Sequence, residues 1–354
     1  MAIILTKYRF QKMRKSFFFI LIVLLFNTKG SWSQNGAGES TFQTSQLGFQ
    51  SVLIGMGGFS SSYTETQSAM YLYNPAFLDS SSKGKLSLGY TRYIGRTNAT
   101  ELGYSMGQRG KFQYAFGFKY LGYGKNETFD QNGNNIGIWS ASDFSFKGIA
   151  SYQVDSSLKV GASLQQAVVQ LPQNSVTASL LDIGFYYKEP NSTWSAALLF
   201  KGMGKVYGID QKSPFDIQFG VSKKPKNAPF RLLLTLYGLQ QWDVLSEDQK
   251  TLDETVDPIS GDVVKEKRWI WGDNAMRHLH TAMEWQFGQM RLFTGFNYER
   301  RKSLQIETAP GLVGMSMGIG FTTKRWEFNY SWSNFNPSNL VHSFGIVFQP
   351  FSYH

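Results

Sequence analysis

The stretch Lys111–Gly124, KFQYAFGFKYLGYG, is the most informative part of this sequence. Its even positions from Phe112 to Tyr120 are all aromatic, whereas the odd positions between them are Gln, Ala, Gly and Lys. Successive side chains of a strand point to opposite faces, so one face of this segment is an unbroken stripe of rings. Large aromatic side chains are rarely left in water, which means that something apolar covers the stripe.

The composition is unusual for a soluble enzyme. Aromatic residues make up 16% of the 354 residues, 35 residues are Gly, and charged residues reach only 17%, against about 25% in typical soluble domains. The net charge of +10 arises largely in residues 1–33, which contain six Lys and Arg and no acid, so that the remainder has 29 bases against 25 acids. This mild basicity does not indicate nucleic acid as a partner.

Residues 12–33 have the layout of a secretory signal peptide. A basic start, KMRK, precedes the apolar run Phe17–Phe26, and small residues follow. This layout predicts a signal peptide at 1–33 and cleavage between Ser33 and Gln34. The alternative is an uncleaved anchor, but a run of about ten residues is short for a bilayer span. The chain contains no Cys, so neither a disulfide framework nor a thiolate site is expected.

From Leu86 onward, alternating segments of about ten residues recur, the length expected of tilted membrane strands. The predicted strands are 86–94, 99–106, 112–121, 143–152, 158–167, 177–188, 193–202, 215–223, 230–238, 279–287, 290–298, 312–322, 325–333 and 341–349. In lipid, only helices and closed barrels satisfy every backbone polar group. The sequence therefore predicts an all-β fold, a transmembrane antiparallel β-barrel of about 14 strands.

The predicted connections alternate between tight and long. The tight ones are 108–110, 155–157, 189–191, 224–229, 288–289 and 323–324, and the long ones are 122–142, 168–176, 203–214, 239–278, 299–311 and 334–340. Outer-membrane barrels have short periplasmic turns and long outer loops, and an even number of strands leaves both barrel ends in the periplasm.

Strand parity assigns the two faces of the barrel. In 325–333, RWEFNYSWS, the aromatic residues share one face and the polar residues the other. A soluble sandwich or propeller also alternates, but Tyr and Trp gather at the strand ends and the polar face is rich in Gly, Ser and Ala, as in membrane barrels. Phe116 is therefore predicted to face lipid and Ala115 the lumen, and a charge at Ala115 is expected to be tolerated better than one at Phe116.

No motif supports catalysis or metal binding. Ser80–Lys83 matches S-x-x-K, but its partner motifs SDN and KTG are absent. His278 and His280 fall two positions apart at a predicted strand start, and joint binding of one metal ion is not expected of them. The run 130–135, DQNGNN, lacks the EF-hand spacing and is expected to form a turn. We therefore expect no catalytic, cofactor-binding or metal-binding residue.

Several charged residues are predicted to face the lumen, either lining an aqueous channel or neutralising one another, and the second arrangement is favoured. They are Lys119, Lys147, Lys159, Lys201, Arg291 and Arg325 with Glu101, Asp143, Asp216, Glu284 and Glu327.

The long connection 239–278 holds the candidate partner contacts Arg268, Trp269 and Trp271, since Trp and Arg are enriched at binding hot spots. The alternative is that the two Trp residues pack across the barrel mouth.

The segment YNPAFL, with Asn74, Pro75 and Ala76, resembles the NPA signature of the FadL-like outer-membrane barrels. This resemblance implies an N-terminal hatch, residues 34–85, that lies in the lumen of a barrel formed by residues 86–354. The stretch 51–63, SVLIGMGGFSSSY, departs from the alanine-rich sequence expected there.

Longer stretches resemble the PorQ family, a FadL-like branch in the type IX secretion system of Bacteroidota. They are 119–146, 214–243, 273–285 and 295–321. The resemblance implies a non-enzymatic anchor in the bacterial outer membrane, in one complex with a PorZ-like surface protein, a PorU-like sortase and a PorV-like barrel, among outer-membrane lipid and lipopolysaccharide.

Two other functions remain open at this point. One is a FadL-like channel for hydrophobic small molecules, for which the predicted lumen is unexpectedly polar. The other is a secreted hydrolase that uses Ser80 and Lys83, which lacks the partner motifs.

Overall fold

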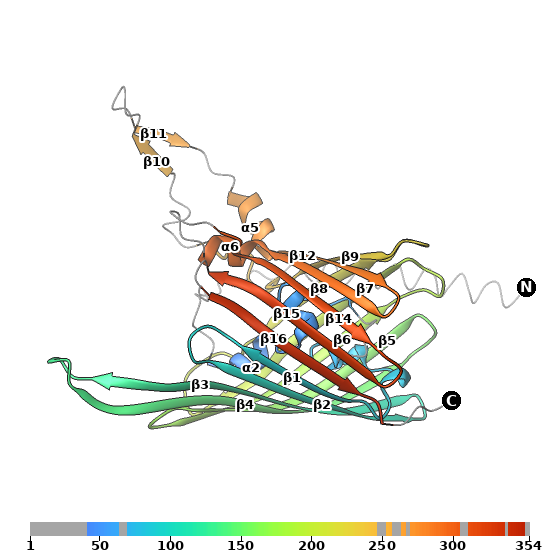
Figure 1. Cartoon of the computed structure of the whole chain (residues 1–354), viewed down its shortest axis with the longest axis horizontal. Helices are drawn as coiled ribbons and strands as arrows, with labels where there is room; N and C mark the ends of the chain where they lie inside the picture. Colours follow the sequence, from blue (N-terminus) through green and yellow to red (C-terminus); the bar gives the residue numbers. More distant parts are fainter. Residues whose placement is uncertain are drawn as a thin grey trace, which may run out of the picture. The chain divides into compact units, whose positions relative to one another are not determined.

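The computed structural model describes residues 41–63, 69–245, 253–256, 263–266, 270–304, 311–336 and 339–350. Fourteen antiparallel strands form a closed barrel (Figure 1). These strands are β1 (Leu86–Arg92), β2 (Asn98–Arg109), β3 (Phe112–Phe129), β4 (Asn135–Gln153), β5 (Leu158–Gln170), β6 (Ser175–Tyr187), β7 (Trp194–Tyr207), β8 (Asp216–Lys223), β9 (Phe230–Leu236), β12 (Leu279–Phe287), β13 (Met290–Asn297), β14 (Met315–Thr322), β15 (Trp326–Asn336) and β16 (Asn339–Phe348).

The first and last strands close the barrel. β1 pairs with β16 from Leu86 opposite Phe348 to Arg92 opposite His342, and every other strand pairs with its two neighbours around the ring. The predicted fold class, an antiparallel barrel of 14 strands, is thus confirmed. β10 (Asp253–Val256) and β11 (Val263–Glu266) form a separate two-stranded sheet. Among the described residues, no helix has the length and apolar character that a membrane crossing requires.

The aromatic stripe faces outward, as the sequence predicts. Phe116 is 57% exposed on the barrel surface, while Ala115 and Lys119 on the opposite face are buried. Neighbouring strands extend the stripe, because Phe118 contacts Phe146 of β4 at 4.9 Å between ring centroids. In a membrane barrel this outer belt is covered by acyl chains.

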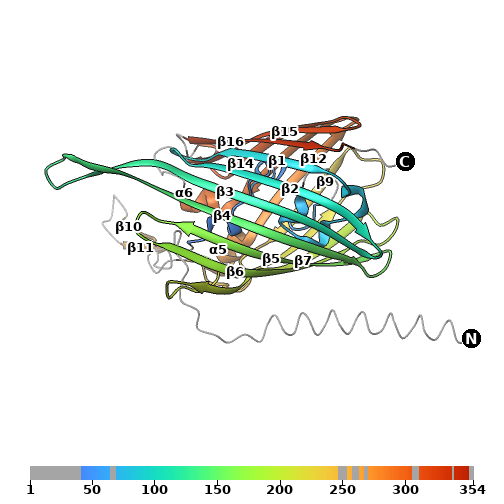
Figure 2. The ribbon, with the colours of Figure 1, turned by 90° about the horizontal axis from the view of Figure 1, so that it is seen from below.

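All six predicted tight turns lie at the end of the barrel where β1 begins and β16 ends, which we call the inner end. The opposite, outer end differs from the prediction. β3 and β4 contain 18 and 19 residues, so most of the predicted loop 122–142 is a hairpin that extends beyond the other strands (Figures 1 and 2). The predicted connections 168–176 and 334–340 are also largely strand. Outside the membrane, no lipid requires an apolar residue at every second position. The alternating sequence pattern therefore ends before the hydrogen-bonded pairing of the strands ends.

The burial of Ala115 argues against the tolerance expected at this position. Ala115 belongs to a buried cluster that joins the lumen wall to N-terminal residues such as Leu72. A charge at this position would lie in a packed interior without water, which is costly unless a partner is present.

We expect Phe116→Lys to lower the free energy of unfolding by about 2–4 kcal/mol, because the charge would lie among acyl chains near mid-bilayer. The matched control is Thr177→Lys on β6, an outward position near the outer end, where the cost falls to about 0–1 kcal/mol. Urea unfolding in lipid vesicles measures both. Equal costs for the two variants would contradict the assigned membrane belt.

Candidate functional site

The N-terminal segment occupies the barrel lumen (blue in Figure 1). Its short elements are α2 (Gln43–Gln46), α3 (Ser51–Gly55), η1 (Met70–Leu72), η2 (Pro75–Phe77) and η3 (Ser80–Ser82). Val52, Met56 and Leu72 of this segment form one buried cluster with wall residues that include Ile149 and Phe293. The contacts agree with a hatch, the name used below for the described residues 41–63 and 69–85. The limits 34–85 remain a prediction, and Ser33 and Gln34 lie outside the described residues.

The Asn74-Pro75-Ala76 turn of the hatch fits against two wall glycines. The Asn74 side chain accepts a hydrogen bond from the backbone N–H of Ala76 at 3.0 Å and caps η2. A Cβ at Gly184 of β6 would lie 2.0 Å from Asn74 Oδ1, and one at Gly161 of β5 would lie 2.2 Å from the Pro75 carbonyl carbon. These two glycines oppose each other in the β5–β6 register, so they form one recess that admits the turn.

Other lumen-facing glycines admit the rest of the hatch. A Cβ at Gly117 would lie 2.2 Å from Leu72, one at Gly220 would lie 2.6 Å from Ser61, and one at Gly295 would lie 2.2 Å from the Met56 backbone. Glycine permits close backbone approach at such sites. The predicted small residues of the polar face therefore give the hatch its space.

Glu101 of β2 is a buried anchor point for the hatch. It accepts hydrogen bonds from the Tyr73 hydroxyl and, at 2.7 Å, from the Gln50 amide. Lys119 pairs with the same carboxylate at 3.4 Å and lies 3.9 Å from the centre of the Tyr73 ring. A buried carboxylate is stable only with such partners, so the wall and the hatch depend on each other here.

Most of the other described luminal charges have an ion-pair or hydrogen-bond partner. Lys147 contacts Asp182 at 2.7 Å and donates to the carbonyl of Leu72 in the hatch at 2.9 Å. Asp143 accepts from the backbone N–H of Thr44 at 2.8 Å. Three further ion pairs link Arg291 with Glu327, Arg231 with Glu284, and Lys159 with Asp79.

The favoured prediction of mutual neutralisation agrees with this arrangement. Three pairing partners, Asp79, Asp182 and Arg231, were missing from the predicted set. Arg325 was wrongly included, because it is exposed at the turn before β15.

One cavity between hatch and wall is small. A luminal cavity lined by residues that include Leu53, Tyr73 and Lys201 has a volume of about 20 Å³, which is about enough for one water. At this place the hatch therefore packs closely against the wall.

Two helices lie at the outer end. Arg277 of α5 (Ile270–His278) pairs with Asp273 at 3.0 Å and with Glu299 of α6 (Tyr298–Leu304) at 2.7 Å. Arg300 of α6 donates to the carbonyl of Gly57 in the hatch at 3.1 Å and to Ser333 of β15 at 2.8 Å. The helices thus connect the hatch to the outer rim.

The predicted partner contacts are only partly described. Trp271 at the start of α5 is 62% exposed, and its ring centroid lies 6.2 Å from that of Trp242. Arg268 and Trp269 lie outside the described residues. His278 was expected at a strand start but ends α5, where its ring stacks on Trp242, whereas His280 is buried in β12.

The weaker chemical motifs form turns. Asp79 accepts hydrogen bonds from the backbone N–H and the hydroxyl of Ser81, so Ser80–Ser82 is a capped turn. At the β3–β4 turn, hydrogen bonds from Asn134 hold the pKa of the Asp130 carboxyl below its usual range. Within the described part of the chain, no group of three or more His, Asp or Glu side chains could hold a metal ion.

Comparison with solved structures identifies the fold. The chain is similar to the CymD monoaromatic hydrocarbon channel, with a TM-score of 0.51 and 14% identity over 89% of this chain and all of that one. A TodX monoaromatic hydrocarbon channel with the deltaS2 mutation gives a TM-score of 0.51 and 14% sequence identity over 87% of this chain and all of that one. A Pseudomonas aeruginosa FadL homologue gives a TM-score of 0.45 and 10% sequence identity over 85% of this chain and 98% of that one. This TM-score is too low to support a conclusion.

The chain has the barrel fold of these two channels. With its apolar belt, this fold confirms the predicted outer-membrane localisation. Both of these similar structures are channels. No protein-family model matches the sequence, and no curated protein sequence matches it.

We expect Gly184→Val to displace the Asn74–Ala76 turn, because the added side chain would overlap Asn74. Limited proteolysis of the folded barrel should then cut the hatch faster than in the unchanged protein. The control is Gly148→Val on the outer face of β4, where a Cβ meets no atom within 4 Å. If Gly184→Val leaves the cleavage rate unchanged, the hatch does not depend on this recess.

Proposed function

We propose that this chain is a non-enzymatic outer-membrane anchor that holds a surface protein at the outer end of a hatch-filled barrel. The observation that carries the proposal is the outer part of the β3–β4 hairpin, Lys125–Phe129 with Asn135–Ser140, called the outer extension below. Among the described residues its strands pair only with each other, since β2 reaches β3 up to Gly122 and β5 reaches β4 from Ser142.

The outer extension exposes apolar side chains beyond the membrane belt. Ile136 is 64% exposed, Ile138 65% and Trp139 40%. Ile136 and Ile138 lie on the face that continues from Phe144, and Trp139 lies on the other face of the strand. Ser140 and Ser142 occupy the outward positions between Ile138 and Phe144, so the belt ends before the extension begins. Large apolar side chains gathered on a surface in water are typical of interaction sites.

The unpaired strand edges support the same proposal. An exposed edge is a template for pairing with another chain, and partner proteins commonly add a strand to such an edge. The hatch also supports a role at the surface, since it is held in the lumen by buried hydrogen bonds and ion pairs at Glu101 and Lys147.

The resemblance to the PorQ family suggests the identity of the partners. We propose a PorZ-like surface protein on the outer extension, in one complex with a PorU-like sortase and a PorV-like barrel. Arg268, Trp269 and Trp271 remain proposed as secondary contacts of the same partner, because Trp271 is exposed at the same end.

We expect the combined change Ile136→Ser, Ile138→Ser and Trp139→Ser to weaken binding of a purified PorZ-like protein at least about tenfold, because buried aromatic and aliphatic anchors dominate interface energies. Binding is measured to the barrel in lipid nanodiscs. Leu171→Ser is the control, since Leu171 is an exposed apolar residue at the neighbouring β5–β6 turn. Unchanged affinity of the triple variant, with the barrel folded, would rule out this docking surface.

A channel for hydrophobic small molecules is the second candidate, and the fold comparisons favour it. Both similar structures with TM-scores of 0.51 are described as monoaromatic hydrocarbon channels. Passage through this lumen would require the hatch to leave its contacts with Glu101, Asp143 and Lys147.

Hydrocarbon uptake by intact cells separates the two candidates. With the anchor function, cells that have the protein and cells that lack it take up toluene equally across the outer membrane. With the channel function, uptake increases with the protein, and Gly184→Val, which loosens the hatch, changes its rate. Uptake above the level of cells without the protein would replace the anchor proposal.

A further inference from the structure

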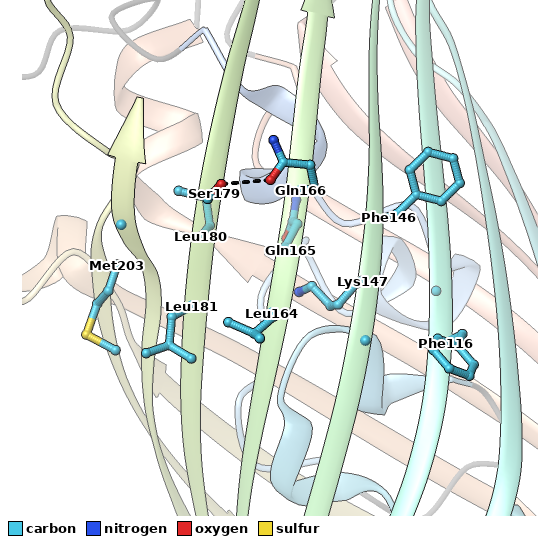
Figure 3. Close-up of a pocket in the computed structure, with 13 residues that line it drawn as sticks. Phe116, Phe146, Lys147, Leu164, Gln165, Gln166, Ser179, Leu180, Leu181 and Met203 are labelled. Atoms are coloured by element: carbon cyan, nitrogen blue, oxygen red, sulfur yellow. Dashed lines mark hydrogen bonds between the residues drawn. The ribbon is translucent and has the colours of Figure 1, made fainter. Parts of the chain in front are cut away.

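A groove of about 730 Å³ lies in the outer surface of the barrel wall (Figure 3). It crosses β3 to β7, and its volume is within the roughly 300–1,000 Å³ of small-molecule sites. Because it opens toward the membrane, whatever occupies it comes from the lipid.

Strand register explains how the groove forms. Phe116, Gly148, Leu164, Leu181 and Met203 are consecutive partners across five strands and share the outward face. Gly148 interrupts this row, and a Cβ there would meet no atom within 4 Å. The missing side chain leaves a depression between the Phe116 ring and Leu164, both of which line the groove.

The next row of cross-strand partners, one step closer to the outer end, is aromatic on β3 and β4 and polar on β5, β6 and β7. Phe118 and Phe146 are followed by Gln166, Ser179 and Lys205, again as consecutive partners. The Ser179 hydroxyl donates to the Gln166 side-chain oxygen at 2.7 Å (Figure 3). The groove is thus apolar toward mid-membrane and polar toward the outer surface.

Lys205 does not line the groove but lies at its polar end, as the register partner of the groove residue Ser179, and carries a positive charge. Its ammonium group lies 5.7 Å from the centre of the Tyr207 ring, and among the described residues it forms no ion pair. The Gln166 amide lies two strands away on the same row, with Ser179 between it and Lys205, and its N–H groups are suited to donate to an anionic oxygen. A cation with neighbouring donors at the membrane surface is suited to a phosphate group.

We infer that this groove binds one molecule of lipopolysaccharide, with an acyl chain over Gly148 and a phosphate at Lys205 and Gln166. We infer lipopolysaccharide rather than another lipid because of the membrane leaflet that the polar end of the groove faces. Lys205 lies in the half of β7 toward the outer end, opposite the end where β1 begins and β16 ends. With the barrel ends in the periplasm, this half meets the outer leaflet. The inference is independent of both functions considered above.

The experiment titrates purified rough-type lipopolysaccharide onto the delipidated, full-length barrel and counts bound molecules by native mass spectrometry. We expect one molecule at low concentration. Lys205→Glu should weaken its binding about tenfold by reversing the charge at the phosphate. Gly148→Phe should weaken it comparably, because the ring would fill the place of the acyl chain.

Two matched variants serve as controls. Lys223→Glu changes the lipid-facing Lys that lies 4.6 Å from the Trp194 ring near the inner end, and Ala196→Leu adds bulk to the outer face of β7 away from the groove. Heat-dependent gel mobility checks that every variant is folded.

The pattern of losses decides the outcome. Selective loss with Lys205→Glu and Gly148→Phe supports the site. Equal loss with the control variants, or no loss with either groove variant, would overturn it. Phosphatidylglycerol is titrated in parallel, and if it occupies the groove as tightly as lipopolysaccharide, the assignment to lipopolysaccharide is wrong.

Discussion

Closure of the ladder between β1 and β16 is the constraint on which the rest of the structure depends. A membrane leaves no water for unpaired backbone groups, so an open sheet edge within lipid is excluded. Pairing from Leu86 with Phe348 to Arg92 with His342 removes that edge. Once the ring is closed, each strand has one face toward lipid and one toward a confined interior, and the two faces require different residues.

The interior side resembles a protein core more than a water-filled pore. Wall glycines such as Gly161 and Gly184 accept the hatch backbone, while Glu101 and Asp182 each have charged or hydrogen-bonding partners. Buried ion pairs of this kind seldom add much stability, but losing one partner leaves an uncompensated charge. They therefore act mainly to fix the position of the hatch.

The sequence predicts those features that lipid imposes locally. The aromatic residues at every second position of 112–120 predict the strand, its lipid-facing side and the barrel class, because a membrane requires apolar residues at every second position of a strand. Beyond the membrane that demand stops, so the extension of β3 and β4 was predicted as a loop. The Lys147–Asp182 pair could not be predicted, since it joins β4 to β6 across β5 and depends on register. The recess for Asn74 likewise requires two glycines, 23 positions apart in the chain, to become opposite partners.

The position of the hatch also limits the order in which the chain can assemble. Its Phe49 carbonyl accepts a hydrogen bond from Thr91 of β1, and the Ser51 hydroxyl contacts Ser331 of β15 and the carbonyl of Ser343 in β16. The hatch therefore touches both sides of the seam that closes last when strands add in chain order. A ring that closed first would have to admit a folded, partly polar segment through its rim. The simpler route is for the later strands to close around the hatch, which then serves as a template for the final pairing.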